Sequence, residues 1–89
     1  MALQIINAGP PAEEIAGRIR SAIADAMPDA TIEIQPQGPG HFEIRVTDAA
    51  FEGLKRVKQQ QLVYGAITEL MAGPNAPVHA IDRLECNVP

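Results

Sequence analysis

Two histidines, His41 and His79, are the side chains of this chain best suited to metal binding or proton transfer near neutral pH. His41 opens an alternating apolar segment at 41–47, and His79 stands at the start of a second apolar segment at 78–88. If these segments form neighbouring parallel strands, both imidazoles lie at one end of a sheet. Because a zinc or iron site takes about four ligands, two histidines would share a metal with another molecule. Two surface histidines with structural hydrogen bonds are the alternative.

The single cysteine, Cys86, lies too far from His79 for both to bind one metal within a monomer. The seven residues between them span about 23 Å in an extended strand. The apolar neighbours of Cys86 predict a small core residue, with a reactive thiol as the alternative. One cysteine also excludes an intramolecular disulfide and a zinc site built from paired cysteines. Ser21 is the only serine and falls on a helix flank, so no serine nucleophile is predicted.

Three cations, Lys55, Arg56 and Lys58, cluster at the start of a predicted helix and precede the glutamines at 59–61. Such a cluster usually marks a solvated helix face. Contact with an anionic partner is the alternative, because positive charge at a helix N-terminus opposes the helix dipole. The chain has 7 basic and 11 acidic residues and a net charge of −4. Any DNA contact would therefore depend on this local patch, and it would be weak.

The size and composition predict one small globular domain. The chain has 89 residues, of which 46% are hydrophobic and 20% charged, which is ordinary for a folded protein. We expect a single domain at 10–89, preceded by a loosely ordered lead-in at 1–9. The sequence lacks the basic segment followed by an apolar stretch that indicates a signal peptide. No apolar run approaches the length of about 18 residues that a transmembrane helix needs. A cytoplasmic protein without membrane contact is expected.

The first half of the domain predicts a helix and a hairpin. The prolines at 10–11 followed by Glu13 and Glu14 indicate a helix start. Apolar residues recur along this helix every four positions, at Ile15, Ile19, Ile23 and Met27. Segments 31–35 and 41–47 alternate with period two, and the loop 36–40 between them is rich in glycine and proline. Ile32 and Ile34 in the first strand and Phe42, Ile44 and Val46 in the second are expected to face inward, which leaves His41 facing outward.

The second half predicts a turn at 48–53, a helix over roughly 55–72 and a strand at 78–88. The inner side of this helix is assigned to Leu62, Val63, Ala66, Ile67, Leu70 and Met71. In the last strand, Val78, Ala80, Leu84, Cys86 and Val88 share one face, and Asp82 interrupts it. The resulting α-β-β-α-β order predicts an α+β two-layer sandwich with both helices on one face of a three-stranded mixed sheet.

Four blocks of the sequence together resemble the BolA family, with a spacing similar to its short bacterial IbaG-like branch. They are Gly40-His41-Phe42, Phe51-Glu52-Gly53, the segment from Arg56 to Tyr64, and Val78-His79-Ala80. The resemblance covers residues 12 to about 86 and implies a topology similar to the class II KH fold. It also implies a non-enzymatic adaptor that partners a monothiol glutaredoxin, with glutathione, and shares a two-iron, two-sulfur cluster with it.

In that resemblance, His79 corresponds to the histidine that the BolA-type partner supplies to the cluster. Many family members add a cysteine or histidine from the loop before the second strand. Residues 35–40 contain neither, so His41 is the candidate for the second ligand. Histidine ligation is pH-sensitive because a protonated imidazole cannot bind, and a labile site suits cluster transfer or iron and stress regulation. The isolated monomer is not expected to bind the cluster tightly.

Two other functions compete with the adaptor. A nucleic-acid-binding transcriptional regulator would use Lys55, Arg56 and Lys58, but the charge balance disfavours it and the KH-type GXXG loop is absent. A thiol peroxidase would need a second cysteine to resolve the oxidised Cys86. Pairing of two copies of the chain into a homodimer is a further alternative for the oligomeric state.

Overall fold

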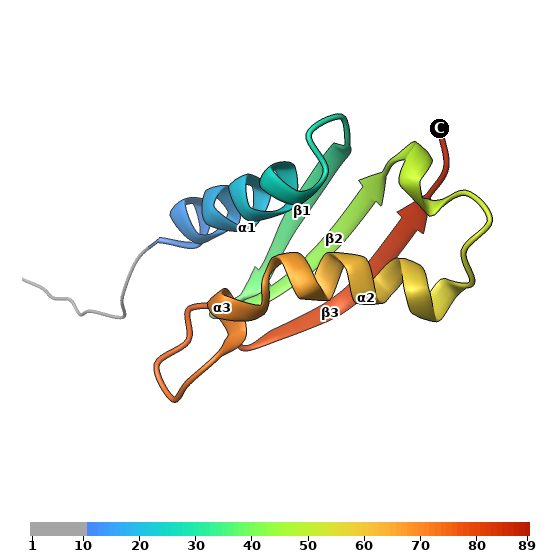
Figure 1. Ribbon diagram of the computed structural model, residues 1–89. Coiled ribbons are helices and arrows are strands. Elements are labelled where there is room, and N and C mark those ends of the chain that lie inside the picture. Colours follow the sequence, from blue (N-terminus) through green and yellow to red (C-terminus); the bar gives the residue numbers. More distant parts are fainter. Residues whose placement is uncertain (1–10) are drawn as a thin grey trace, which may run out of the picture.

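The computed structural model describes residues 11–89, in which the two long helices α1 and α2 cover a three-stranded sheet. The predicted lead-in at 1–9 lies outside the described residues. In chain order the elements are α1 (Ala12–Ala26), β1 (Thr31–Gly38), β2 (His41–Thr47), the 3-10 helix η1 (Ala49–Phe51), α2 (Arg56–Ala66), α3 (Thr68–Met71) and β3 (Ala80–Asn87). Helices α1 and α2 lie on the same face of the sheet (Figure 1), which confirms the predicted α+β sandwich.

The sheet has the strand order β1-β2-β3 and is mixed, as predicted. β1 pairs with β2 antiparallel, and β2 pairs with β3 in parallel. The predicted loop at 36–40 is wrong in extent, because β1 continues to Gly38 and only Pro39 and Gly40 form the turn. Pro36 is tolerated within the strand because β1 is an edge strand, where a missing N–H need not break a ladder. The pairing shifts register between Pro36 and Gly38.

The core lies between α1, α2 and the inner face of the sheet. Ile15, Ile19 and Ile23 of α1 are buried at the predicted spacing. Phe42, Ile44 and Val46 of β2 are also buried, which leaves His41 on the outer face. This alternation confirms the predicted parity of β2. Ile32 and Ile34 of β1 are half-buried and pack against the same cluster.

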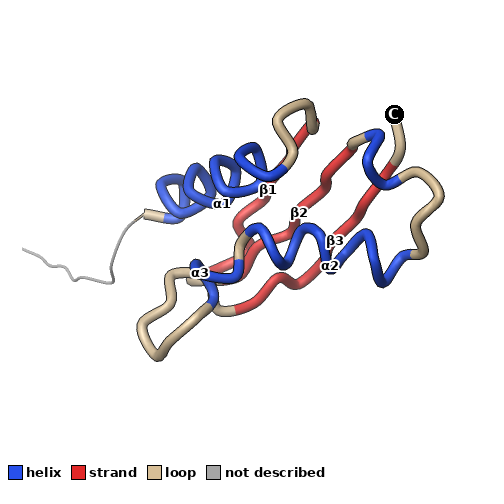
Figure 2. The backbone as a smooth tube through the Cα atoms, in the orientation of Figure 1, coloured by secondary structure: helices blue, strands red, loops and turns tan. Residues whose placement is uncertain are grey.

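The predicted single helix over 55–72 is wrong: it is divided at Ile67 (Figure 2). Ile67 has φ −110° and ψ 14°, outside the helical region, and its side chain is buried. The Thr68 hydroxyl donates to the Tyr64 carbonyl at 2.9 Å across this break. Leu62, assigned to the inner side, is 44% exposed. Successive residues of an α-helix are rotated by about 100° around its axis, so when Val63 faces the core its neighbour Leu62 points away from the core.

The last strand is shorter than predicted and contains a bulge. It spans 80–87 instead of 78–88, and Val88 is exposed instead of facing inward. Phe42 pairs with Ile81 and Glu43 with Arg83, so Asp82 is an extra residue on β3. The bulge explains the broken alternation in the sequence. Ile81 precedes it and Leu84 and Cys86 follow it, yet all three pack against the core.

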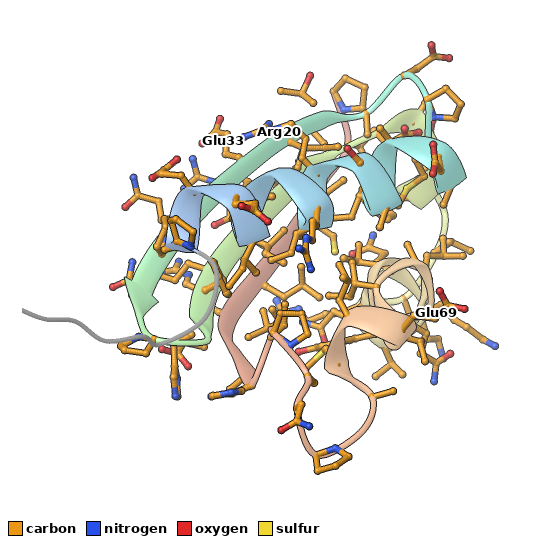
Figure 3. The ribbon with its side chains drawn as sticks, turned by 90° about the vertical axis from the view of Figure 1, so that its left-hand side faces the viewer. Arg20, Glu33 and Glu69 are labelled. Atoms are coloured by element: carbon orange, nitrogen blue, oxygen red, sulfur yellow. The ribbon has the colours of Figure 1, made fainter. Side chains whose placement is uncertain are left out.

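Side chains from the helices reach both edge strands. The Arg20 guanidinium of α1 donates to the Ile32 carbonyl of β1 at 2.6 Å, and Figure 3 shows Arg20 extending toward Glu33. On the other edge, the Gln60 amide of α2 donates to the Leu84 carbonyl of β3 at 3.5 Å. These contacts tie each helix to the strand that it lies beside.

Candidate functional site

His79 lies immediately before β3, at the end of the sheet where β2 begins. Its backbone N–H donates to the Gly40 carbonyl at 2.8 Å, and the N–H of Ala80 donates to the same carbonyl at 3.1 Å. These two hydrogen bonds hold the turn between β1 and β2 against the start of β3. The His79 side chain itself is exposed, so its imidazole can be reached from outside the fold.

Gly40 positions the imidazole of His79 by having no side chain. It has φ +76°, a conformation that favours glycine. A Cβ at this position would lie 2.5 Å from Nδ1 and 2.6 Å from Cγ of His79. The ring therefore lies directly against the Gly40 backbone, where any larger residue would displace it. Gly40 was recognised in the sequence only as part of a motif, because its role depends on a ring 39 residues away along the chain.

The His79 groove is an open depression of about 820 Å³ at this end of the molecule. Its walls are the first turns of α1, the β1–β2 turn and the loop before β3, and five prolines line it. Ile15 contributes apolar surface, and Arg18 is the one Lys, Arg, Asp or Glu side chain among the described residues that line it. The Arg18 guanidinium also pairs with Glu14 at 2.9 Å. The groove thus combines an imidazole, a guanidinium and apolar walls.

His41 lies at the same end of the sheet but on the opposite face. It precedes the buried Phe42 and so projects from the outer face, whereas His79 lines a groove with residues of α1. His41 Nδ1 lies 2.9 Å from Asp82 Oδ1, and the two side chains are 46% and 42% exposed. Sequence reasoning missed this partner, which is brought into reach by the bulge in β3. The interrupted alternation at Asp82 was its only signal. His41 as a metal ligand stays a prediction.

The basic cluster lies at the other end of the sheet from His79. Lys55 is the N-cap of α2, and Arg56 and Lys58 belong to its first turn. This turn follows the end of β2, where Thr47 pairs with Asn87, the last residue of β3 (Figure 1). All three side chains are exposed, and within residues 11–89 none of them forms an ion pair. The structure therefore separates the two sets of candidate residues.

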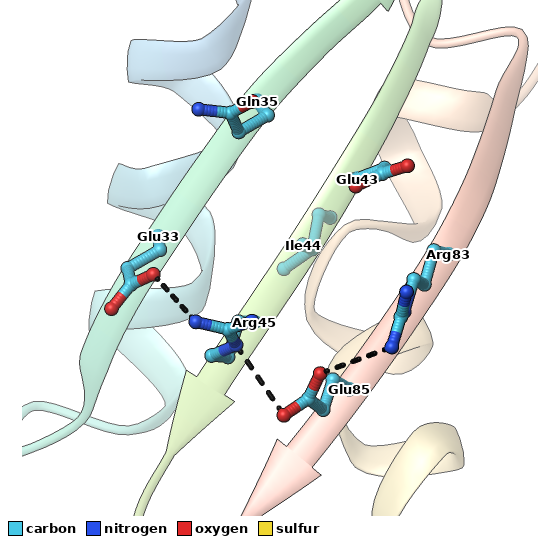
Figure 4. A pocket seen from close by; sticks show the side chains of 7 residues that line it. All are labelled: Glu33, Gln35, Glu43, Ile44, Arg45, Arg83 and Glu85. Carbon is cyan, nitrogen blue, oxygen red and sulfur yellow. Dashed lines mark hydrogen bonds and ion pairs between the residues drawn. The ribbon is translucent and has the colours of Figure 1, made fainter.

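The outer face of the sheet carries a chain of ion pairs around a shallow pocket of about 260 Å³ (Figure 4). Arg45 lies 3.1 Å from Glu33 and 3.4 Å from Glu85, and Arg83 lies 3.7 Å from Glu85. A hydrogen bond from Asn87 and the charge of Arg45 lower the pKa of Glu85. Exposed pairs of this kind are screened by solvent and contribute little to stability, so this face is a solvated surface.

Within the described part of the chain, no three His, Cys, Asp or Glu side chains come together as a metal site. Burial raises the pKa of the Cys86 thiol, which disfavours its reactive thiolate form. Cys86 is half-buried against the core, as predicted for a small core residue. Of the helices in residues 11–89, none has the length and apolar character needed to cross a bilayer.

Comparison with protein families identifies the chain. The model for BolA-like proteins matches residues 19–86. The chain belongs to the BolA-like family. It is 32% identical over 63 residues to the acid stress protein IbaG of Escherichia coli K12, a match that covers 71% of each chain. It is 38% identical over 56 residues to an uncharacterized Acinetobacter guillouiae protein from the rpoN-murA intergenic region, covering 63% of this chain and 64% of that relative.

The fold agrees with this membership. The solution structure of BolA1 from Mus musculus matches this BolA-like chain with a TM-score of 0.73 and 27% identity. The match covers 97% of this chain and 75% of that one. The resemblance predicted from the four sequence blocks and the predicted α+β sandwich are therefore both confirmed.

Proposed function

We propose that this BolA-like chain is a non-enzymatic adaptor that supplies His79 to a two-iron, two-sulfur cluster shared with a monothiol glutaredoxin. The observation that carries the proposal is the exposed imidazole of His79, held against Gly40 in a groove to which residues 11–89 contribute no complete set of metal ligands. Such a site offers one donor and needs the others from a second molecule.

The donor set fits a shared cluster better than a resident metal. A two-iron, two-sulfur cluster takes four ligands from its surroundings, so a single imidazole leaves three positions to the partner side. The thiolates of a glutaredoxin and of glutathione are soft ligands that suit iron–sulfur clusters. The groove beside His79 has apolar walls and the Arg18 guanidinium, which can pair with a carboxylate of glutathione.

Ligation by a histidine makes the shared cluster easier to release. An imidazole binds iron only in its neutral form, so acidification favours the release of this ligand. A cluster held in this way is easier to pass on than one held by four thiolates. This property supports a role in cluster trafficking or in iron and stress regulation.

His41 is the candidate for a second ligand, but its side chain lies on the opposite face of the sheet from that of His79. Its Nδ1 is engaged by Asp82 on the outer face, so Nε2 is the nitrogen left for a metal. Ligation of the same iron by both histidines would require the His41 ring to turn around the end of β2. Comparing single variants of the two histidines tests this directly.

The test mixes the full chain with a cluster-loaded monothiol glutaredoxin and follows visible absorption, circular dichroism and elution on a sizing column. We expect a new spectrum and a heterodimer, both lost in His79→Ala. His41→Ala is the matched control, because it removes the same side chain from the other face of the sheet. If it keeps both signals, His79 is the single ligand; if it loses them, His41 is the second. A His79→Ala variant that still forms the cluster-bridged heterodimer would refute the proposal.

A further inference from the structure

A second open surface lies between α2 and β3, at the other end of the sheet from His79. Val57, Gln60 and Tyr64 are spaced three and four residues apart and so share one side of α2. The Gln60 amide reaches the Leu84 carbonyl, which places this side of the helix against β3. Val57 is 63% exposed and Tyr64 is 38% exposed. Val57 and Tyr64 are therefore exposed apolar side chains on the side of α2 that carries Gln60.

The α2–β3 groove along this side has a volume of about 310 Å³. It is lined by Arg56, Gln59 and Gln60 from α2 and by residues 83–87 from β3. β3 is an edge strand that pairs only with β2 among the described strands, so its other side has no strand partner. An incoming strand would displace the 3.5 Å contact between the Gln60 amide and the Leu84 carbonyl. The bulge at Asp82 interrupts regular pairing at the start of β3, which leaves 83–87 as the segment able to accept another strand.

The charge around the groove favours an acidic partner. Arg56 and Arg83 line it, and Lys55 and Lys58 flank it on the first turn of α2. This turn contains no acidic residue and has no side-chain cap, so its positive charges oppose the helix dipole without local compensation. The one acidic residue lining the groove, Glu85, is already paired with Arg45 and with Arg83, so the cations left without an acidic neighbour are Arg56 and the flanking lysines.

We propose that the α2–β3 groove binds an extended acidic segment of a partner protein, which adds as a strand to residues 83–87 of β3. Backbone hydrogen bonds to β3 give the affinity, as in other cases of strand addition. Apolar side chains of the segment rest on Val57 and Tyr64, and its acidic side chains pair with Arg56. A nucleic acid would use the cations but not the exposed Val57 or the open strand edge. The surface is independent of the His79 groove, so one chain can hold two partners.

The experiment uses the full chain and a fluorescein-labelled synthetic peptide of alternating glutamate and valine, with binding followed by anisotropy. Two control peptides carry lysine in place of glutamate, or N-methyl groups on alternate amides. We expect the acidic peptide to bind, the lysine peptide to fail, and N-methylation to abolish binding because it removes strand hydrogen bonds. Arg56→Glu should weaken binding about tenfold and Val57→Gln about fivefold, as for central contacts of an interface. Amide exchange at 83–87 should slow on binding.

Arg18→Glu is the matched control for charge, since it makes the same reversal on α1, away from the groove. It should leave peptide binding unchanged, as should His79→Ala, which separates this surface from the cluster site. Four results would overturn the proposal: no binding of the acidic peptide, equal binding of the N-methylated peptide, an equal loss in Arg18→Glu, or a homodimer that Val57→Gln dissolves. Displacement of the peptide by a short single-stranded DNA, whose own binding depends on Arg56 but not on Val57, would reassign the surface to nucleic acid.

Discussion

Replacing Gly40 by alanine tests whether this glycine keeps space for the imidazole of His79. Two effects add. Alanine at φ +76° costs about 1–2 kcal/mol of folding free energy, because its Cβ crowds the backbone in the left-handed region. The new Cβ would also lie 2.5 Å from Nδ1 of His79. Since His79 is exposed, its ring moves aside before the backbone does, so this second effect changes the position of the ring more than the stability.

Gly53→Ala separates the two effects. Gly53 has φ +79°, yet a Cβ there would meet nothing within 4 Å. Both variants should therefore lose about 4–16 °C in melting temperature, given about 4–8 °C per kcal/mol for a domain of this size. Only Gly40→Ala should shift the ring resonances of His79 in NMR spectra and reduce cluster-dependent pairing toward the level of His79→Ala. If the two variants behave alike in stability, ring resonances and pairing, Gly40 does not position His79.

Three further predictions concern the core and two titrating groups. Ile23→Ala, at a fully buried position, should lower the free energy of unfolding in urea by about 2–5 kcal/mol, whereas Val57→Ala on the surface should change it by less than about 0.5 kcal/mol. Burial raises the pKa of Cys86, so the folded state is stabilised below the thiol's unfolded pKa and loses this contribution as pH rises through the folded pKa. Alkylation with iodoacetamide should therefore accelerate only at more alkaline pH than for a free cysteine. Unfolding the chain in urea should abolish this difference. The hydrogen bond from Asn87 is the main cause of the lowered pKa of Glu85. The small difference in the free energy of unfolding between the native chain and Glu85→Gln should therefore be present at neutral pH and disappear as pH falls through the folded pKa of Glu85.

The parts of the fold that could be predicted are those in which one periodicity runs unbroken. The spacing of Ile15, Ile19 and Ile23 is repeated along the whole of α1, and Phe42 and Ile44 alternate with polar residues along β2. In each element, one side is buried over its full length, so a single pattern in the sequence is enough. The parallel pairing of β2 and β3 followed from the order of the elements and places both histidines at one end of the sheet.

The errors arose where a tertiary contact interrupts a local pattern. The break occurs at Ile67, whose side chain is buried, and the nearest signal in the sequence is Gly65, two residues earlier. The bulge at Asp82 changes the parity near the start of β3, so a strand read with one phase misplaces Ile81, which packs against the core together with Leu84 and Cys86. The same bulge sets the Asp82 carboxylate beside His41, a contact between residues 41 positions apart whose only signal in the sequence was the interrupted alternation at Asp82.

The parallel pairing of β2 with β3 also decides how the candidate sites are distributed. After β2 the chain must return along the sheet before β3 can begin, and α2 makes this return (Figure 1). The start of α2 is thereby placed at one end of the sheet and His79, which follows the return, at the other. Lys55, Arg56 and Lys58 cannot serve the His79 groove from that position. A chain this small can therefore present two separate surfaces. Substitutions in one surface should leave binding at the other unchanged. An adaptor between two partners requires this independence.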